Sequence, residues 1–349
     1  MTGAEQAESR QDDSPPSMAA GGIRPAWWRW LLPLVFAAAM VGFGYGLGDR
    51  AFVFPEGAAL AFGVLVVDKP DWVFSRWRLL VLPTACAVAG SVAVNLAMPK
   101  AAAEVLALFF AVALMQTVKG RLGPVVSAAV LPVVFGITTW IYPATVAGIC
   151  LALVAMVSLP RWRPQGPAVV AAPPPSRWPW PALMLFVVIA VAWIALASLA
   201  LPLPPVALAP PLLVAGLEWC AQGAGPPRVA VRRWALLVTA AAVGGLASWV
   251  SPVIHGGIAP AQALAASAAQ LAAVGVVLIV LAWTGEYLYP ALAIALVPAL
   301  VAPISPGPYL LAIGIGAAAL YGGATVCAGT GRIVHTVFSR VARAATEQP

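Results

Sequence analysis

The chain has 349 residues, of which 62% are hydrophobic and 9% charged, and Lys and Arg outnumber Asp and Glu by 19 to 12. Soluble domains carry about 25% charged residues, so this composition excludes a soluble globular fold and indicates an all-α, polytopic membrane protein. No run of basic residues interleaved with aromatics is present. The basic excess therefore argues for membrane topology and against nucleic acid as a partner.

The N-terminal residues 1–24 are polar, rich in Ser, Pro, Glu and Asp, and without periodicity. We expect a disordered cytoplasmic tail, because such a segment cannot bury enough apolar surface to fold. It does not resemble a cleavable signal peptide. The first apolar segment then opens with Trp27, Trp28 and Trp30 beside Arg29, the residue types expected at the cytoplasmic headgroup level.

Twelve apolar segments follow, and their loops differ in charge. The segments span approximately residues 27–47, 51–67, 79–98, 101–118, 122–140, 142–159, 182–201, 205–221, 234–250, 261–282, 287–303 and 308–326. If the N-terminus is inside and the chain crosses the membrane twelve times, every Lys and Arg except Arg50 and Lys100 lies on the inner side. This pattern predicts twelve transmembrane helices in a bacterial-type cytoplasmic membrane, with both termini in the cytoplasm. Several segments are shorter than the ~20 residues of a full span, so re-entrant segments are the alternative.

The longest break in hydrophobicity divides the chain into two similar halves. In them Pro55 matches Pro210, and Pro99 matches Pro260. We expect two six-helix repeats, which are parallel because an even number of crossings returns the chain to the same side. The expected regions are a tail (residues 1–24), a first repeat (25–159), a Pro- and Arg-rich cytoplasmic linker (160–181), a second repeat (182–328) and a basic cytoplasmic tail (329–349).

Each half also carries two prolines eight residues apart, Pro124 with Pro132 and Pro290 with Pro298. Proline removes an amide donor from a helix, so both runs should be broken or kinked. A helix that begins at Pro124 or Pro290 would point amide donors at an anionic group. Nearby polar side chains either satisfy the freed carbonyls or line a cavity; they are Asn95, Gln116, Thr117, Ser127, Thr284, Tyr287 and Tyr289.

Two short segments that start with proline, Pro55–Val67 and Pro210–Cys220, occupy matching places in the halves. Short or interrupted segments at matching places indicate the substrate site of a transporter, and tilted packing helices are the alternative. Lys119 and Arg121 lie at the expected inner mouth. They either attract anions or serve only as topological anchors.

Four acids lie in or near apolar runs: Glu56, Glu104, Glu218 and Glu286. An intramembrane carboxylate marks a pathway or a proton relay. All four are near segment edges, however, where side chains can instead reach the headgroups. Because no basic residue lies deep in an apolar run, we expect no buried salt bridge.

Other chemistry has little support in the sequence. The four cysteines are single and lie in apolar runs, and the two histidines, His255 and His335, are isolated. We therefore expect no metal site and no cofactor. A nucleophile elbow, a phosphate-binding Gly-rich loop and an HExxH motif are all missing from the sequence, so no enzymatic activity is expected.

The stretches LGPVVSAAV and LYPALAIAL resemble the motif region of the HPP family of integral membrane proteins, named for a His-Pro-Pro motif that opens a late helix. The resemblance covers residues 50–158 and 205–326 and implies a tandem duplicate of the family unit. The family's proline matches Pro124 and Pro290, but its His falls on Gly123 and Tyr289, and the double Pro is lost. Family members are linked to nitrite transport, so the resemblance implies transport without naming the solute. The chain also resembles the fusaric-acid-resistance and aromatic-acid-exporter group, whose large cytoplasmic region the short linker cannot supply.

The sequence thus predicts a secondary transporter of a small anion or an aromatic or organic acid. With no ATP-binding motif, an ion gradient would drive it, with Glu56 or Glu218 as the proton carrier. The pathway candidates are Glu56, Gln116, Pro124, Ser127, Glu218, Tyr289 and Pro290. The alternative is a non-transporting membrane scaffold or assembly partner. The expected partners are the lipid bilayer and an unidentified solute; the oligomeric state is open, with a homo-oligomer as one alternative.

Overall fold

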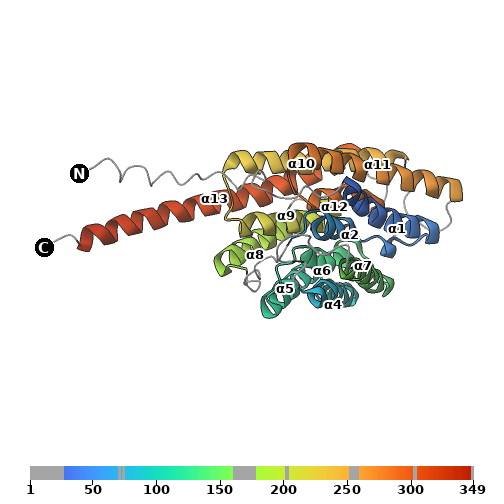
Figure 1. Cartoon of the computed structure of the whole chain (residues 1–349). Helices are drawn as coiled ribbons and strands as arrows, with labels where there is room; N and C mark the ends of the chain where they lie inside the picture. Colours follow the sequence, from blue (N-terminus) through green and yellow to red (C-terminus); the bar gives the residue numbers. More distant parts are fainter. Residues whose placement is uncertain are drawn as a thin grey trace.

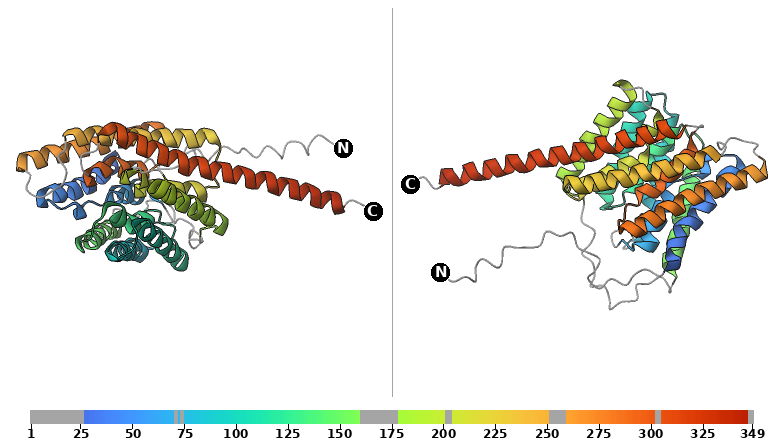
Figure 2. Two further views of the ribbon diagram at one scale, coloured as in Figure 1. Left: turned by 180° about the vertical axis from the view of Figure 1, so that it is seen from behind. Right: turned by 90° about the horizontal axis from the view of Figure 1, so that it is seen from above.

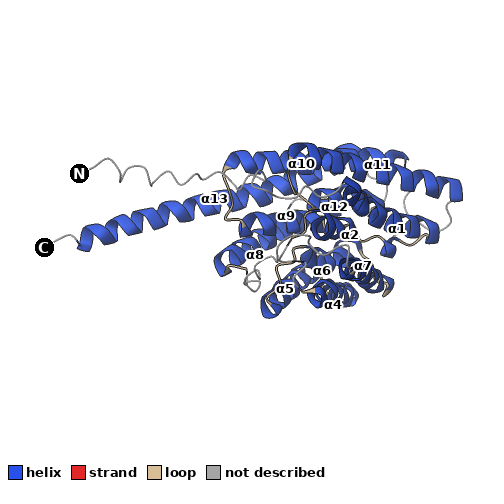
Figure 3. Ribbon diagram, in the orientation of Figure 1, coloured by secondary structure: helices blue, strands red, loops and turns tan. Residues whose placement is uncertain are grey.

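The computed structural model describes residues 27–69, 72, 75–159, 178–200, 204–250, 259–301 and 305–346, and side chains beyond residue 327 are not described. All regular structure in these ranges is helical, with no strand (Figure 3). The predicted all-α class is confirmed. The predicted N-terminal tail and most of the predicted linker lie outside the described residues.

Within the described ranges, eight helices are long and apolar enough to cross a membrane. They are Trp27–Leu47 (a 3₁₀ turn and α1, Leu32–Leu47), α4 (Arg76–Asn95), α5 (Lys100–Val118), α7 (Ile141–Ser158), Trp180–Leu199 (α8, Trp180–Ala195, and part of a π-helical turn), α10 (Pro227–Val250), α11 (Pro260–Thr284) and α13 (Pro306–Thr346). Large apolar side chains such as Phe43, Val188 and Ile279 are exposed on their outer faces. Such a surface needs a lipid environment, so the chain is a multi-pass membrane protein.

Four shorter helical segments lie at the centre of the bundle and are almost completely buried (Figures 1 and 2). They are α2 (Glu56–Ala61) with a π-helical turn (Phe62–Val66), α6 (Pro124–Phe135), a 3₁₀ turn (Pro205–Leu208) with α9 (Pro210–Ala221), and α12 (Pro290–Leu296) with a 3₁₀ turn (Val297–Leu300). The 12 residues of α6 cover about 18 Å, well short of a ~30 Å hydrocarbon core. All twelve predicted segments are thus helical, but only eight have the length of a span.

Contacts between elements come in matched sets. In the first half α4 packs against α5, α6 and α7, and in the second half α10 packs against α11, α12 and α13. Between the halves, α6 lies against α9 while α12 lies against α2, and α1 lies against α11 while α5 lies against α8. For each of these contacts, the corresponding elements of the other half make the matching contact.

The prolines at the starts of α6 and α12 occupy the first helical position, where the missing amide costs nothing. Pro132 lies inside α6 and cannot donate to the carbonyl of Ala128, four residues earlier. The hydroxyl of Tyr142, at the start of α7, donates to that carbonyl at 3.2 Å. As a result α6 continues unbroken through Pro132 to Phe135.

The second half has a similar arrangement. Pro298 cannot donate to the carbonyl of Ile294, which accepts instead from the N–H of Val297 and from the hydroxyl of Tyr309, near the start of α13, at 2.6 Å. Here the α-helix does end, passing into a 3₁₀ turn at Val297. Of the two runs predicted to be broken or kinked, the one in the second half is therefore broken, and the one in the first half is a continuous helix with Pro132 inside it.

Close approach of the short helices to their neighbours depends on glycine. Gly90 on α4 lies so near the carbonyl oxygen of Ala129 on α6 that a Cβ atom would overlap it. Gly244 on α10 stands in the same relation to Ala295 on α12. Only a residue without a side chain allows these backbones to pack so closely.

Many of the polar contacts between elements lie at the two ends of the bundle. One end, called the basic end here, holds the donor side chains Lys69, Trp72, Arg76, Arg78, Gln116, Arg232 and Arg233. At the opposite end Arg50 and Lys100 donate to the carbonyls of Gly136 and Val134, where α6 ends, at 3.4 and 2.6 Å. Cations are favourable at the C-terminal end of a helix, so the two exceptions to the predicted charge pattern stabilise a central helix.

The last helix extends past the bundle. In Figure 1 α13, in red, projects well beyond the other helices, and it ends at Thr346. Most of the predicted C-terminal tail, residues 329–349, is therefore a helical continuation of the last apolar segment.

Candidate functional site

The starts of α6 and α12 meet at the basic end. A Cβ atom placed on Gly123 would lie 3.0 Å from the hydroxyl of Tyr289 and 3.2 Å from Oε1 of Glu218, on α9. Gly123 and Tyr289 each directly precede the proline that begins a short helix. Gly123 and Tyr289, the two positions that the HPP resemblance aligns with a histidine, thus lie close to each other, beside a carboxylate.

Lys69 reaches this point from the loop after the π-helical turn. Its Nζ atom lies 3.2 Å from Oε2 of Glu218, and the two side chains are only 25% and 14% exposed. The ammonium is also 4.6 Å from the centroid of the Trp72 ring and 4.2 Å from that of Tyr289. The ion pair is therefore partly buried, and its cation comes from a loop that folds into the interface rather than from within an apolar run.

A pocket of about 220 Å³ opens beside this ion pair, lined by Lys69, Trp72, Arg121, Trp178, Glu218, Ala221 and Gln222. The indole nitrogen of Trp72 donates to the carbonyl of Arg121 at 2.9 Å, which fixes the ring against the loop before α6. The Arg121 guanidinium lies 6.0 Å from the centroid of the Trp178 ring. Two cations, one carboxylate and two indole rings thus line a small space. The excess of positive charge and the donors of Lys69 and Arg121 suit an anion.

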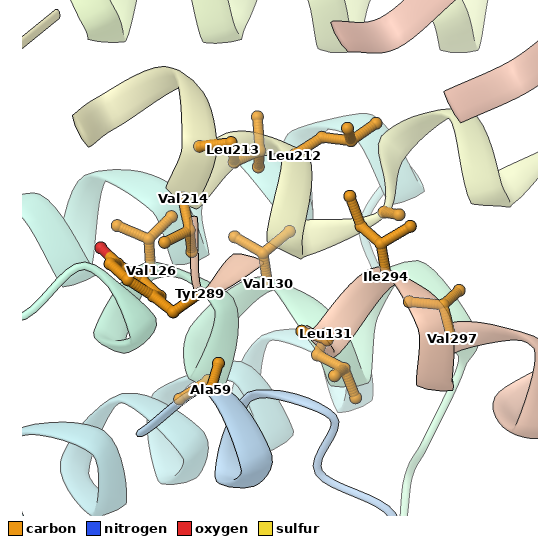
Figure 4. Close-up of a cluster of buried hydrophobic side chains, with 14 of the residues drawn as sticks. Ala59, Val126, Val130, Leu131, Leu212, Leu213, Val214, Tyr289, Ile294 and Val297 are labelled. Carbon is orange, nitrogen blue, oxygen red and sulfur yellow. The ribbon is translucent and has the colours of Figure 1, made fainter. Parts of the chain in front are cut away.

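Much of the space between this pocket and the opposite end is apolar. Figure 4 shows Val126 and Val130 of α6 on the side of the helix toward Val214 and Ile294 of the second half. All of these residues are buried. The pocket is therefore closed on its inner side in this conformation.

Glu56 begins α2 and is fully buried. One of its oxygens accepts a hydrogen bond from the hydroxyl of Ser127 on α6, and the other has no partner among the described residues. Glu56 does not extend to the headgroups, which removes that alternative for this residue. The carboxyl of Glu56 is thus held inside the helix bundle by one hydroxyl donor.

A second pair of buried polar side chains lies on α5 and α11. Glu104 and Gln270 are 1% and 0% exposed, and within the described part of the chain neither carboxylate oxygen and neither amide atom has a hydrogen-bond partner. Lys100, one turn before Glu104, directs its ammonium to the carbonyl of Val134. Glu104 therefore lies apart from the pocket at the basic end.

The remaining predicted residues have structural roles. Gln116 is buried and donates to the carbonyl of Trp178 at 3.1 Å. Lys119 is an exposed left-handed cap at the end of α5 and does not line the pocket. Glu286 pairs with Arg232 at 3.2 Å.

Asp68, beside Lys69, adds a further carboxyl near the site. Burial raises the pKa of Asp68, and the positive charge of Arg29 opposes the shift. Asp68 is not one of the residues that line the pocket.

The site residues that sequence reasoning missed are Lys69, Trp72 and Trp178. The sequence places Lys69 in an inner loop, and nothing in the local sequence shows that this loop folds against α9. Gly63 was the available signal. A Cβ atom there would overlap the Trp72 ring, so the glycine marks the place where that indole packs onto the π-helical turn.

Within the described residues, no group of three or more His, Cys, Asp and Glu side chains could hold a metal ion. Cys86, Cys150 and Cys220 are buried as expected, whereas Cys327 is exposed. His255 lies outside the described residues, and the side chain of His335 is not described. Comparisons of the chain with protein-family models, curated proteins and solved structures gave no match.

Proposed function

We propose that the chain is built from two parallel repeats of six helices each, with twelve crossings and both termini in the cytoplasm. The matched contacts between elements, the two tyrosine hydroxyls on proline-freed carbonyls and the two glycine approaches support it. In this reading the HPP-like stretches are the starts of α6 and α12. Each short helix connects the basic end with the opposite end, in a locally thinned or invaginated part of the bilayer.

We further propose that the protein is a secondary transporter of a small anion. The observation that carries the proposal is the pocket at the basic end, where Lys69, Arg121 and three aromatic rings gather at the contact between the two proposed repeats. Transporters built from repeats place their substrate sites at the repeat interface, among discontinuous or short helices. A cationic mouth also raises the local concentration of anions.

Glu56 is the proposed proton-binding group. It is buried, lies between α2 and α6, and has a single hydroxyl donor in Ser127. Movement of the short helices would expose this carboxyl to one side of the membrane and then the other. Glu218, the other candidate from the sequence, is instead the counter-ion of Lys69.

Uptake by proteoliposomes under an imposed pH gradient tests both assignments. The probes are radiolabelled succinate, 4-hydroxybenzoate and inorganic phosphate, each compared with protein-free vesicles. We expect the wild type to take up at least one probe and Lys69→Gln to take up none. Uptake by Glu56→Gln should not depend on the pH gradient. Glu286→Gln removes a carboxylate at the same end outside the pocket and should behave as wild type.

A non-transporting scaffold is the second candidate. The observation that favours it is the apolar packing of Val126, Val130 and Ile294 at the centre, which leaves the pocket closed on its inner side. A scaffold would give no uptake of any probe although the purified protein is folded and monodisperse. A transporter in a closed resting state would give uptake with these same side chains in place.

A further inference from the structure

We propose that Glu218 is a built-in competitor of the substrate: its carboxylate holds Lys69 in the empty protein, and a small carboxylate binds by displacing it. The inference rests on the proposed function in that it takes the pocket at the basic end as the substrate site. It adds the chemical class of the ligand and the exchange by which the ligand enters.

The arrangement around Lys69 leaves room for one carboxylate. The ammonium has three donors, and the faces of Trp72 and Tyr289 already enclose it at 4.6 and 4.2 Å. Glu218 pairs with it at 3.2 Å, and the rest of the ammonium faces the adjoining pocket. A second carboxylate at this ammonium would stand a few ångströms from Glu218, and like charges so close in a half-buried place repel strongly. Ligand and Glu218 therefore exclude each other.

The ligand class follows from the group that is displaced. Because the Lys69 ammonium binds the carboxylate of Glu218, it can bind the same group on a small molecule. The adjoining pocket of about 220 Å³ offers Arg121 as a second cation and Trp178 as an apolar wall for the rest of the ligand. A pocket of this volume has room for a small carboxylate.

Glu218 has a second cation within its own half. Gln222, the cap residue that follows α9, comes four residues after Glu218, and its Oε1 accepts a bond from Nη1 of Arg233 at 2.7 Å. A displaced Glu218 side chain turns along the same face toward Arg233. The exchange would replace an ion pair between the two halves with one inside the second half, so ligand binding loosens the contact between the halves.

Ligand titration of the purified protein in detergent tests the exchange without requiring transport. The probes are acetate and benzoate, followed by calorimetry. We expect Glu218→Gln to bind at least one probe about three- to tenfold more tightly than wild type, because an ion pair of modest strength no longer competes. Glu286→Gln, which breaks an ion pair of equal length outside the pocket, should match wild type. Lys69→Gln should lose binding, alone and combined with Glu218→Gln.

Two results would overturn the inference. One is Glu218→Gln binding no more tightly than wild type; the other is Glu286→Gln gaining as much as Glu218→Gln. Glu218→Ala serves as the second variant if Glu218→Gln does not fold, and the same tightening is expected of it. Tighter binding without any uptake in proteoliposomes would refute transport and keep the exchange, whereas uptake with unchanged binding would refute only the exchange.

Discussion

The hydroxyl of Tyr142 donates a hydrogen bond to the carbonyl of Ala128, the group that Pro132 leaves without its helical amide partner. Tyr309 stands in the same relation to Ile294 in the other half. A backbone carbonyl in an apolar interior needs a donor, and a neighbouring side chain is the usual source in a membrane helix. The prolines at the centre are therefore supported by the tyrosines around them.

Removal of either hydroxyl should destabilise the protein. Tyr142→Phe and Tyr309→Phe each remove a hydrogen bond to a buried carbonyl, so each should lower the free energy of unfolding by up to about 1 kcal/mol. The larger loss is expected for Tyr142→Phe, because the carbonyl of Ile294 keeps the N–H of Val297 as a donor. Chemical denaturation in detergent measures the change. Tyr321→Phe is the matched control, because that buried hydroxyl has no partner among the described residues and its removal should have little effect. Equal losses in all three variants would contradict the role assigned to Tyr142 and Tyr309.

Glycine at the two close approaches should be indispensable. Gly90→Ala and Gly244→Ala place a methyl group against the carbonyls of Ala129 and Ala295, so the helices must separate. We expect a loss of about 3 kcal/mol or more, or failure to fold, because overpacking of a tight helix contact is costly. Gly148→Ala on α7, with open space around it, should fold normally and unfold at a similar temperature.

The proposed crossing by α6 can be tested on its two flanks. Lys119 and Thr138 are both exposed and lie on either side of α6. Single-cysteine variants at these positions, in a background without the native cysteines, should react with an impermeant maleimide from opposite sides of the membrane. Lys119→Cys should label only after the inner face is made accessible. Labelling of both from one side would show a re-entrant α6.

Glu104 should tolerate replacement by an amide of nearly the same shape. Burying a charged or chargeable carboxyl without hydrogen-bond donors costs more free energy than burying a neutral amide in the same place. Glu104→Gln should thus unfold at a higher temperature than wild type in thermal unfolding in detergent. A lower unfolding temperature for Glu104→Gln would show that the carboxyl makes a stabilising interaction that the amide cannot replace.

Sequence reasoning predicted the helical elements well because hydrophobicity and charge determine them directly. Both Pro-started segments and the starts of α6 and α12 were located within a residue or two. Length was the weak point. Several predicted segments that look long enough, such as 122–140, end early, because capping at Gly136 terminates the helix before the apolar run does.

The site could be predicted only in part. Gly123, Glu218 and Tyr289 were singled out by spacing and charge, and the structure brings them together. Lys69 could not be placed, because its position depends on how a loop of one half folds against a helix of the other. No local pattern encodes such a contact between distant segments.

Counterflow tests anion transport through the Lys69 site directly, since it requires no knowledge of the coupling ion. Proteoliposomes are loaded with unlabelled succinate, 4-hydroxybenzoate or phosphate and diluted into a trace of the labelled compound. The account predicts transient accumulation of label for at least one anion in the wild type and none in Lys69→Gln. Accumulation no greater than in protein-free vesicles for all three anions, or equal accumulation in Lys69→Gln, would contradict it.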